Sequence, residues 1–172
     1  MHKHFTIAAC AASCLFSGFS FAADQLAAVV VTATRQATRV NEVIADVTVI
    51  DREAIEQAGS STIGELLGRQ AGVQVVSTGG AGAAITVFIR GANSGHTLLL
   101  VDGLRFGSAT TGQSAFETIP LSQVERIEIL RGPAGAIYGA DAIGGVIQIF
   151  TRRGESAPHF DAFAGIGSQG TV

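Results

Sequence analysis

The sequence is poor in the residues on which much enzyme chemistry depends. It has no tryptophan, one tyrosine, one methionine and two cysteines. Both cysteines (Cys10 and Cys14) and the only lysine (Lys3) lie close to the N-terminus. A chain that loses this stretch on export has no thiol nucleophile, no thiolate zinc site and no Schiff-base lysine. It also has no disulfide and no lysine to complete a phosphate-binding loop.

A serine hydrolase is disfavoured as well. The nearest match to a nucleophile elbow is Gly91-Ala92-Asn93-Ser94-Gly95, in which the serine stands one place too late. Asp51, Asp102 and Asp141 are better explained as a helix cap, a turn residue and a loop residue. We therefore predict that the chain is not an enzyme and has no catalytic residues, no metal site and no cofactor.

The charge balance argues against a nucleic-acid partner. The chain has 14 acidic residues against 11 Lys and Arg, a net charge of -3. Beyond residue 22 arginine is the only strongly basic residue type left, and the balance becomes more negative. Nucleic-acid binding proteins need a clustered positive surface, so we predict no nucleic-acid binding.

The first 22 residues have the plan of a secretory signal peptide. Lys3 precedes a mostly apolar stretch (residues 5–19), and Ser20-Phe21-Ala22 supplies small residues for cleavage after Ala22. The apolar stretch is too short, and too often interrupted by serine and glycine, to span a membrane. A lipoprotein site at Cys10 is the alternative, but little apolar core would precede that cysteine. We predict an exported protein.

Residues 23–41 form a leader whose centre favours a β-strand. Ala27-Ala28-Val29-Val30-Val31-Thr32-Ala33-Thr34 is rich in β-branched residues, and no turn or partner strand is evident beside it. This run is either an edge strand of the domain or a strand that adds to the sheet edge of another protein.

The rest of the chain alternates short strands, short helices and glycine-bearing loops. A helix begins after Asp51 and ends at Gly59, and Thr62 and Glu65 open a second helix that runs to Arg69. Asp102-Gly103 is a tight-turn signal, and a helix or turn is expected at 133–138. Strands are predicted at 46–50, 73–77, 85–90, 97–101, 124–130 and 146–151. This order predicts a small α+β domain with a mixed β-sheet, short helices and long Gly-rich loops.

Several short motifs occur in an order that resembles one family. Val29-Val30-Val31-Thr32-Ala33-Thr34-Arg35 is similar to a TonB box, and Phe88-Ile89-Arg90-Gly91 and Leu100-Val101-Asp102-Gly103 are similar to central plug motifs. Val124-Glu125-Arg126-Ile127-Glu128, Arg131-Gly132-Pro133 and Tyr138-Gly139 resemble the last third of a plug. The chain thus resembles the N-terminal plug domain of TonB-dependent outer-membrane receptors, and within that family the cobalamin receptors.

The resemblance implies a domain plan and a mechanism. It places a signal peptide at 1–22, a periplasmic leader at 23–41 with its TonB box at 27–34, a plug at 42–155 and the start of a first barrel strand at 156–172. A plug of this kind normally sits inside a 22-stranded β-barrel in the outer membrane of a Gram-negative bacterium. The box would pair with TonB, whose inner-membrane complex draws on the proton-motive force. No further barrel strands follow in this chain, so we expect a receptor fragment, or else a stand-alone exported binding protein located in the periplasm.

Site residues carried over from the resemblance fall into two further groups. Arg90 and Arg131 would pair with acidic residues of the receptor's own barrel wall. The positions that match ligand-contacting plug residues are Ala84, Thr86, Asn93, Thr110 and Thr111. The ligand implied is cobalamin, with a ferric siderophore as the alternative, because all such receptors share the plug motifs. The other explanation of these five residues is that they are ordinary solvated loop positions.

Overall fold

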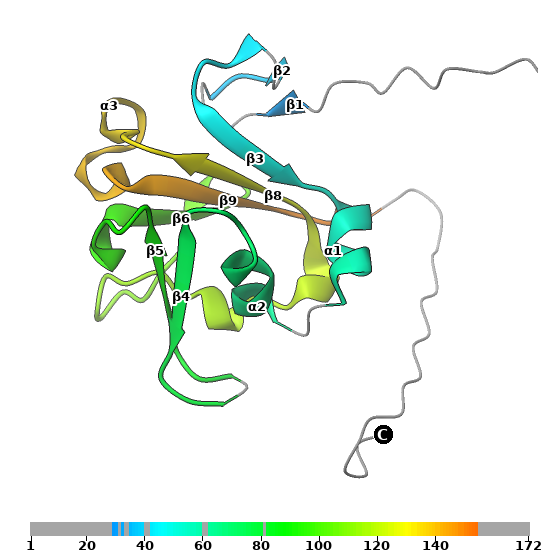
Figure 1. Ribbon diagram of the computed structural model, residues 1–172, viewed down its shortest axis with the longest axis vertical. Coiled ribbons are helices and arrows are strands. Elements are labelled where there is room, and N and C mark those ends of the chain that lie inside the picture. Colours follow the sequence, from blue (N-terminus) through cyan, green and yellow to red (C-terminus); the bar gives the residue numbers. More distant parts are fainter. Residues whose placement is uncertain are drawn as a thin grey trace, which may run out of the picture.

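A five-stranded mixed sheet forms the centre of the molecule (Figure 1). The computed structural model describes residues 29–30, 32, 35–39, 42–59, 62–80 and 82–154. The predicted signal peptide (1–22) and the segment from residue 155 onward lie outside these residues. The arrangement of the described part confirms the predicted small α+β domain.

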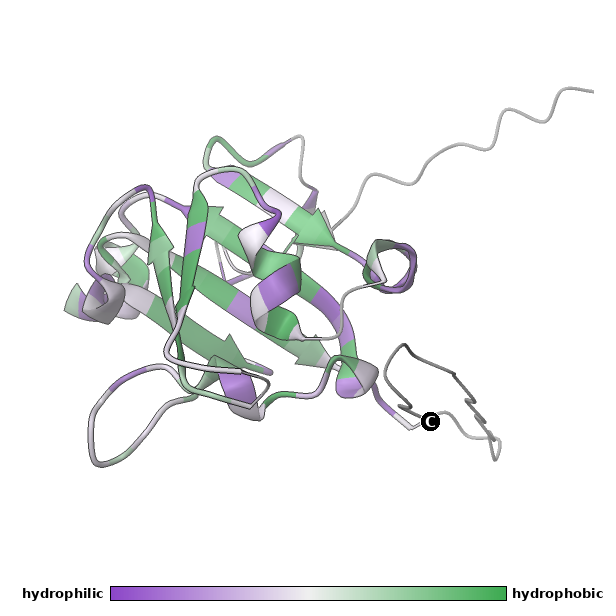
Figure 2. Cartoon of the chain, turned by 60° about the horizontal axis from the view of Figure 1, so that its bottom comes forward, coloured by the Kyte–Doolittle hydropathy of each residue, from purple (hydrophilic) through white to green (hydrophobic). Residues whose placement is uncertain are grey.

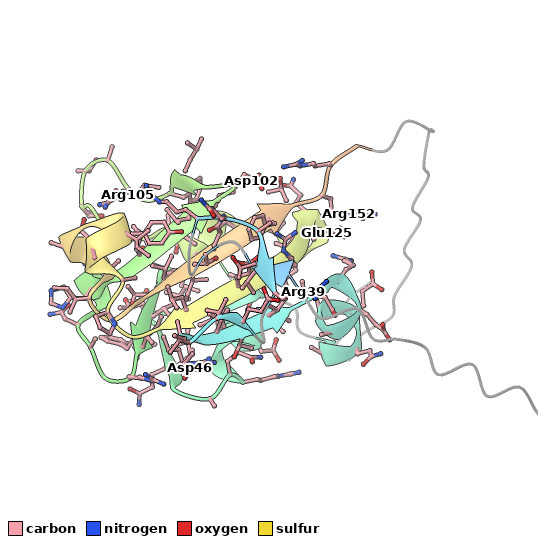
Figure 3. All side chains as sticks on the ribbon, turned by 90° about the horizontal axis from the view of Figure 1, so that it is seen from above. Arg39, Asp46, Asp102, Arg105, Glu125 and Arg152 are labelled. Atoms are coloured by element: carbon pink, nitrogen blue, oxygen red, sulfur yellow. The ribbon has the colours of Figure 1, made fainter. Side chains whose placement is uncertain are left out.

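The sheet combines antiparallel and parallel strands. Its order is β3 (Asp46–Ile50), β8 (Val124–Arg131), β9 (Gly145–Thr151), β6 (Thr97–Val101) and β7 (Leu104–Arg105). β6 and β9 are parallel, and the other neighbouring pairs are antiparallel. Glu125, near the start of β8, and Arg152, which follows β9, lie at the same end of the sheet (Figure 3). The two longest strands of the sheet, β8 and β9, both come from the last third of the chain.

Two capped helices and a hairpin cover one face of the sheet. The Asp51 carboxylate accepts a hydrogen bond from Ala54 N (2.9 Å) at the start of α1 (Arg52–Ala58), and Gly59 ends this helix with a φ of 57°. Thr62 Oγ1 accepts from Glu65 N (3.2 Å) at the start of α2 (Ile63–Gly68). Both predicted caps are therefore confirmed. The hairpin of β4 (Val73–Ser77) and β5 (Ile85–Ile89) packs beside α2 (Figure 1).

Hydrophobic residues predominate in the strands of the sheet, as their green colouring shows (Figure 2). Alternate residues of a strand point to opposite faces, so β6, β8 and β9 each contribute to two clusters. The larger cluster joins the sheet to the helices and the hairpin, and includes Ile55, Leu66, Val87, Leu99, Ile127, Ile129, Ile147 and Ile149. The smaller cluster lies on the opposite face and includes Leu98, Leu100, Leu130, Ala134, Ala142 and Val146. This two-sided burial explains the unbroken apolar run of β6.

Tight turns and short helical segments connect the strands. Asp102 and Gly103 have φ values of 49° and 86° and join β6 to β7 as a two-residue hairpin. α3 (Gly135–Tyr138) and a 3-10 turn at Ala140–Ala142 lead from β8 to β9. None of the helices in the described ranges has the length and hydrophobicity that crossing a membrane requires.

The leader differs from the sequence-based expectation in one respect. No partner strand is evident beside this run in the sequence, yet β1 (Val29–Val30) pairs antiparallel with β2 (Thr38–Arg39). Thr38 and Arg39 lack the apolar alternation that marks a strand, so their pairing was not visible in the sequence. The chain folds back on itself here, and the small ribbon lies beside the large sheet (Figure 1).

Candidate functional site

The structure fixes part of the predicted TonB box against the body of the domain. Val29 and Val30 lie in β1, and both Val30 and Thr32 are fully buried. Ala27, Ala28, Val31, Ala33 and Thr34 lie outside the described residues. Val29, Val30 and Thr32 are therefore the three positions of the box that the structure describes.

Thr32 binds a buried carboxylate of the central sheet. Its backbone N–H and its hydroxyl both donate to Glu128 Oε2, at 2.8 and 2.7 Å, and the hydroxyl also lies 3.1 Å from Gln148 Oε1. Glu128 is fully buried, although it belongs to a strand whose alternation would place it on a polar face. The leader thus covers a polar spot on the sheet that would otherwise face solvent.

Tyr138 of α3 holds Thr32 from the other side. Its hydroxyl donates to the Thr32 carbonyl (2.9 Å), and the Arg35 guanidinium lies 4.6 Å from the centre of its ring. Burial raises the pKa of the Tyr138 phenol, and this outweighs the lowering effect of nearby Arg35. The phenol therefore stays protonated at neutral pH and can donate its hydrogen bond.

A second candidate site is a polar hollow of about 450 Å³ between two loops. Ser94 and Gly95, in a short 3-10 turn, form one side of this hollow, and residues 106–109 and 112–114 form another. Arg105 and Asp141 also line it and form an ion pair. Its hydroxyl, amide and backbone groups could bind a ligand rich in hydrogen-bonding groups.

The structure brings most of the five candidate ligand residues to this region. Asn93 caps the 3-10 turn by accepting from Gly95 N (3.1 Å), and exposed Thr110 and Thr111 lie in the loop that lines the hollow. Thr86, in β5, lines a small cleft that shares Ser94 with the hollow. Ala84 precedes Thr86 by two positions and lines neither. A ligand contact of these residues stays a prediction.

Sequence reasoning missed Thr97, which also lines the hollow. Its side chain is only 3% exposed, and its Oγ1 has no hydrogen-bond partner among the described residues. A buried hydroxyl normally has a partner, so this atom is unusual beside a hollow. At the first position of an apolar strand, a threonine gives no sequence signal of this feature.

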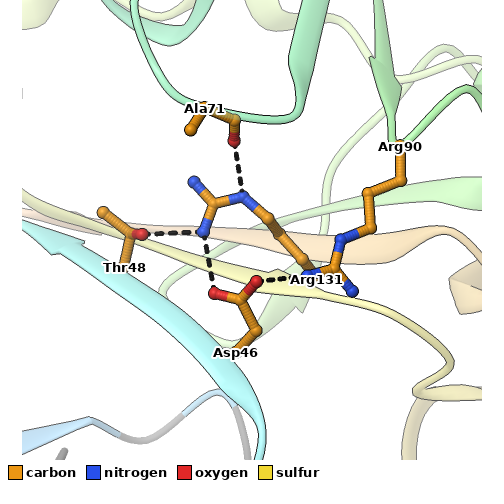
Figure 4. A network of polar contacts seen from close by, with 5 residues as sticks. All are labelled: Asp46, Thr48, Ala71, Arg90 and Arg131. Atoms are coloured by element: carbon orange, nitrogen blue, oxygen red, sulfur yellow. Dashed lines mark hydrogen bonds and ion pairs between the residues drawn. The ribbon is translucent and has the colours of Figure 1, made fainter.

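The two arginines predicted to pair with a barrel wall both bind Asp46 within the domain (Figure 4). Arg131 is only 7% exposed, and it donates to Asp46 Oδ1 (3.2 Å), Thr48 Oγ1 (2.7 Å) and the Ala71 carbonyl (2.8 Å). The side chain of Arg90 is 53% exposed and donates to the other oxygen of Asp46. The network ties β3, β8, β5 and the start of β4 together.

Metal chemistry has no visible basis in the described part of the chain. No group of three or more His, Cys, Asp or Glu side chains there is arranged to hold a metal ion. The two candidate sites are instead a strand held by hydrogen bonds and a hollow lined by polar, apolar and ion-paired side chains. Both suit binding and conformational change.

Comparison with protein families identifies this architecture. The family described as "TonB-dependent Receptor Plug Domain" matches residues 39–146, which is more than half of the chain. The chain belongs to the TonB-dependent receptor plug family. The predicted membership of this family is therefore confirmed, and the match covers the plug motifs from Phe88 to Gly139.

Curated relatives of this plug include vitamin B12 transporters. BtuB of Photobacterium profundum is 45% identical over 174 residues, covering 99% of this chain and 28% of the relative. BtuB of Vibrio cholerae is 44% identical over 140 residues, covering 81% of this chain and 23% of the relative. The chain thus spans about a quarter of the length of these relatives.

Solved structures with a similar fold include siderophore receptors. A mutant of the ferric enterobactin receptor PfeA from Pseudomonas aeruginosa is 31% identical, with a TM-score of 0.56. The matched region covers 74% of this chain and 20% of the receptor chain. The ferric yersiniabactin uptake receptor FyuA from Yersinia pestis is 28% identical, with a TM-score of 0.53. Here the matched region covers 66% of this chain and 18% of the receptor chain. All these relatives are transporters or receptors, which supports the prediction that this plug is not an enzyme.

Proposed function

We propose that this chain is the gating plug of an outer-membrane receptor that takes up cobalamin with energy supplied through TonB. The observation that carries the ligand is the sequence match to vitamin B12 transporters, 45% identity over 99% of the chain. Siderophore receptors of similar fold are 28% to 32% identical and cover less of the chain. A ferric siderophore is the alternative ligand.

In this proposal the polar hollow and its loops form the plug's share of the ligand site. Thr86 lines the adjoining cleft, and Asn93, Thr110 and Thr111 belong to the two loops whose other residues line the hollow. Thr97 adds a buried hydroxyl without a partner among the described residues. The hollow of about 450 Å³ would receive part of a large ligand, and the receptor's outer loops would cover the rest.

Residues 27–34 are the strand that TonB recruits. Adding a strand to a sheet edge uses main-chain hydrogen bonds, so a plain Val, Thr and Ala segment is sufficient. In this structure β1 and β2 pair over only two residues each. Exchanging so short a ladder for a longer one with the C-terminal sheet of TonB would lose few hydrogen bonds.

Arg90 and Arg131 are proposed to contact the barrel of the intact receptor. Arg90 is the better placed of the two, because its side chain is more than half exposed and Asp46 is its only side-chain partner in the described structure. Arg131 is nearly buried and already makes three hydrogen bonds. Its contact with a barrel residue would have to add to this network.

A chimeric receptor tests the proposal. The matching N-terminal quarter of the Vibrio cholerae vitamin B12 transporter is replaced by this chain, and cobalamin-dependent growth is measured in a strain that lacks its own transporter. We expect growth with the chimera and none after deletion of residues 27–34. A chimera that reaches the outer membrane but takes up no cobalamin contradicts the proposal.

A parallel chimera with the rest of PfeA tests the alternative ligand. Uptake of ferric enterobactin by this second chimera, without uptake of cobalamin by the first, would favour a siderophore. A stand-alone binding protein predicts something else again, because the full chain by itself would then bind ligand tightly. Its affinity would not change when residues 27–34 are deleted.

A further inference from the structure

Glu128 is a carboxylate buried in the middle of a β-sheet, where an unpaired charge is costly. One of its oxygens accepts two hydrogen bonds from Thr32, and the other accepts from Arg126 Nε at 3.1 Å. Arg126 is itself held over the Phe150 ring, 3.6 Å from its centre. The leader therefore supplies both hydrogen bonds to one oxygen of this carboxylate.

Thr32 is held through both of its backbone polar groups. Its N–H donates to Glu128, and its carbonyl accepts from Tyr138. A residue that joins the edge of a partner sheet uses these same two groups in the new ladder. Thr32 therefore cannot pair with a partner strand while it is docked on the domain.

The neighbouring leader residues are likewise unavailable to a partner strand. Val29 and Val30 are already paired with Arg39 and Thr38, and the Val30 side chain is fully buried. Arg35, which follows the box, is stacked on the ring of Tyr138. The docked leader is thus held by strand pairing before Thr32, by side-chain hydrogen bonds at Thr32 and by stacking after it.

We propose that Glu128 and Tyr138 form a latch that keeps the leader strand closed, and that a partner can recruit this strand only when the latch opens. The inference rests on the proposed function for its partner, TonB. It adds the residues that decide whether the strand is available. Glu128 and Tyr138 act through the position of Thr32 and need no contact with either ligand or partner.

The replacement Glu128→Gln weakens the latch with little change in shape. A glutamine carries one oxygen and one NH₂ group where the carboxylate has two oxygens. If the oxygen faces Thr32, the NH₂ group meets Arg126 Nε. In the opposite orientation the NH₂ group meets the two donors of Thr32. In the first orientation both Thr32 hydrogen bonds go to a neutral oxygen and lose their charge assistance, and in the second the Thr32 N–H loses its acceptor. The hold on Thr32 is therefore weaker either way.

Amide hydrogen exchange of the full chain, followed by NMR, tests the latch without any partner. In E128Q we expect the Thr32 amide to exchange at least about tenfold faster, as for the loss of one charge-assisted hydrogen bond. The amides of Ile127, Ile129 and Ile147 should change by less than about twofold. T32S keeps both donors and is expected to behave like the wild type, whereas T32V loses the hydroxyl and should lie in between.

Unchanged exchange at Thr32 in E128Q, with the sheet amides also unchanged, overturns the latch. If the sheet amides accelerate as much as Thr32, the variant has loosened the whole domain, and Tyr138→Phe decides. This variant removes only the hydroxyl that holds the Thr32 carbonyl, and a rise of about threefold at Thr32 alone is expected from a neutral hydrogen bond. No rise at Thr32 in Y138F then overturns the proposal.

Binding of a C-terminal fragment of TonB separates the latch from the proposed function. A latch that hides the strand lowers the apparent affinity by the fraction of open molecules, so E128Q should bind the fragment tighter by about the factor seen in exchange. If exchange accelerates but no variant binds TonB, the latch stands and the proposed partner is wrong. If E128Q and wild type bind TonB equally despite faster exchange, the latch does not control recruitment.

Discussion

The Arg131 network allows a stability prediction with a built-in comparison. Replacing Arg131 by methionine keeps most of the volume of the side-chain stem and removes all three hydrogen bonds, to Asp46, Thr48 and Ala71. Replacing Arg90 by methionine removes an exposed partner of the same carboxylate. The two variants each remove one ion pair of Asp46, the buried one with Arg131 and the exposed one with Arg90.

The expected costs follow from burial. A hydrogen bond to a charged group contributes about 1.5–3 kcal/mol, but the three of Arg131 are not additive. Asp46 is 47% exposed and keeps Arg90, so water and that arginine would compensate part of the loss in R131M. We therefore expect the free energy of unfolding to fall by about 2–3 kcal/mol in R131M. Arg90 is mostly in solvent, and R90M should cost only about 0–1 kcal/mol.

Urea unfolding of the full chain, followed by far-UV circular dichroism, measures both costs. The midpoint should fall clearly for R131M and little for R90M, with similar slopes for both variants and the wild type. Equal losses, or a larger loss for R90M, would refute the claim that the buried arginine ties β3, β8 and the start of β4 together. A changed slope in R131M would mean that the unfolding reaction itself has changed.

Two further predictions concern single positions. Gly145→Ala should lower the free energy of unfolding by about 2 kcal/mol or more, because a Cβ there would lie 2.4 Å from the Leu130 carbonyl oxygen. The control Gly135→Ala places its Cβ in open space and should cost nothing measurable in the same urea assay. Tyr138 is the only tyrosine of the chain, so a pH titration of tyrosine absorbance reports its pKa directly. R35M should raise that pKa further, whereas E128Q should lower it toward the ordinary value of about 10. Shifts of the same sign in both variants would contradict the causes assigned to it. The contribution of Tyr138 to stability should be fully present below about pH 10, the pKa of an unfolded tyrosine, and be lost as the pH rises through the higher folded-state pKa.

Local signals in the sequence were sufficient for much of the fold. Strands 46–50, 73–77 and 97–101 match the structure residue for residue, and both helix caps are formed as predicted. Capping residues, turn residues and alternation act over a few positions, so they can be recognised without knowing the tertiary structure. Sequence reasoning was weakest where long-range contacts decide.

Glu128 illustrates the limit. The alternation of Val124 to Leu130 places this residue on the polar face of its strand, yet it is fully buried and bound by Thr32 of the leader, 96 residues earlier in the chain. The pairing of β1 with β2 was missed for a similar reason, since Thr38 and Arg39 carry no strand pattern of their own. The unpartnered hydroxyl of Thr97 appears only when the two loops of the hollow are folded beside it.

The measurement that tests the central claim most directly is the affinity of the full chain for a C-terminal fragment of TonB, with a matched pair of variants at Val29. Proline at this position removes a backbone N–H and prevents strand pairing, whereas isoleucine preserves both backbone and strand preference. We predict that the wild type and V29I bind the fragment and that V29P and the chain lacking residues 27–34 do not. Equal binding by all four chains would contradict recruitment of the leader strand.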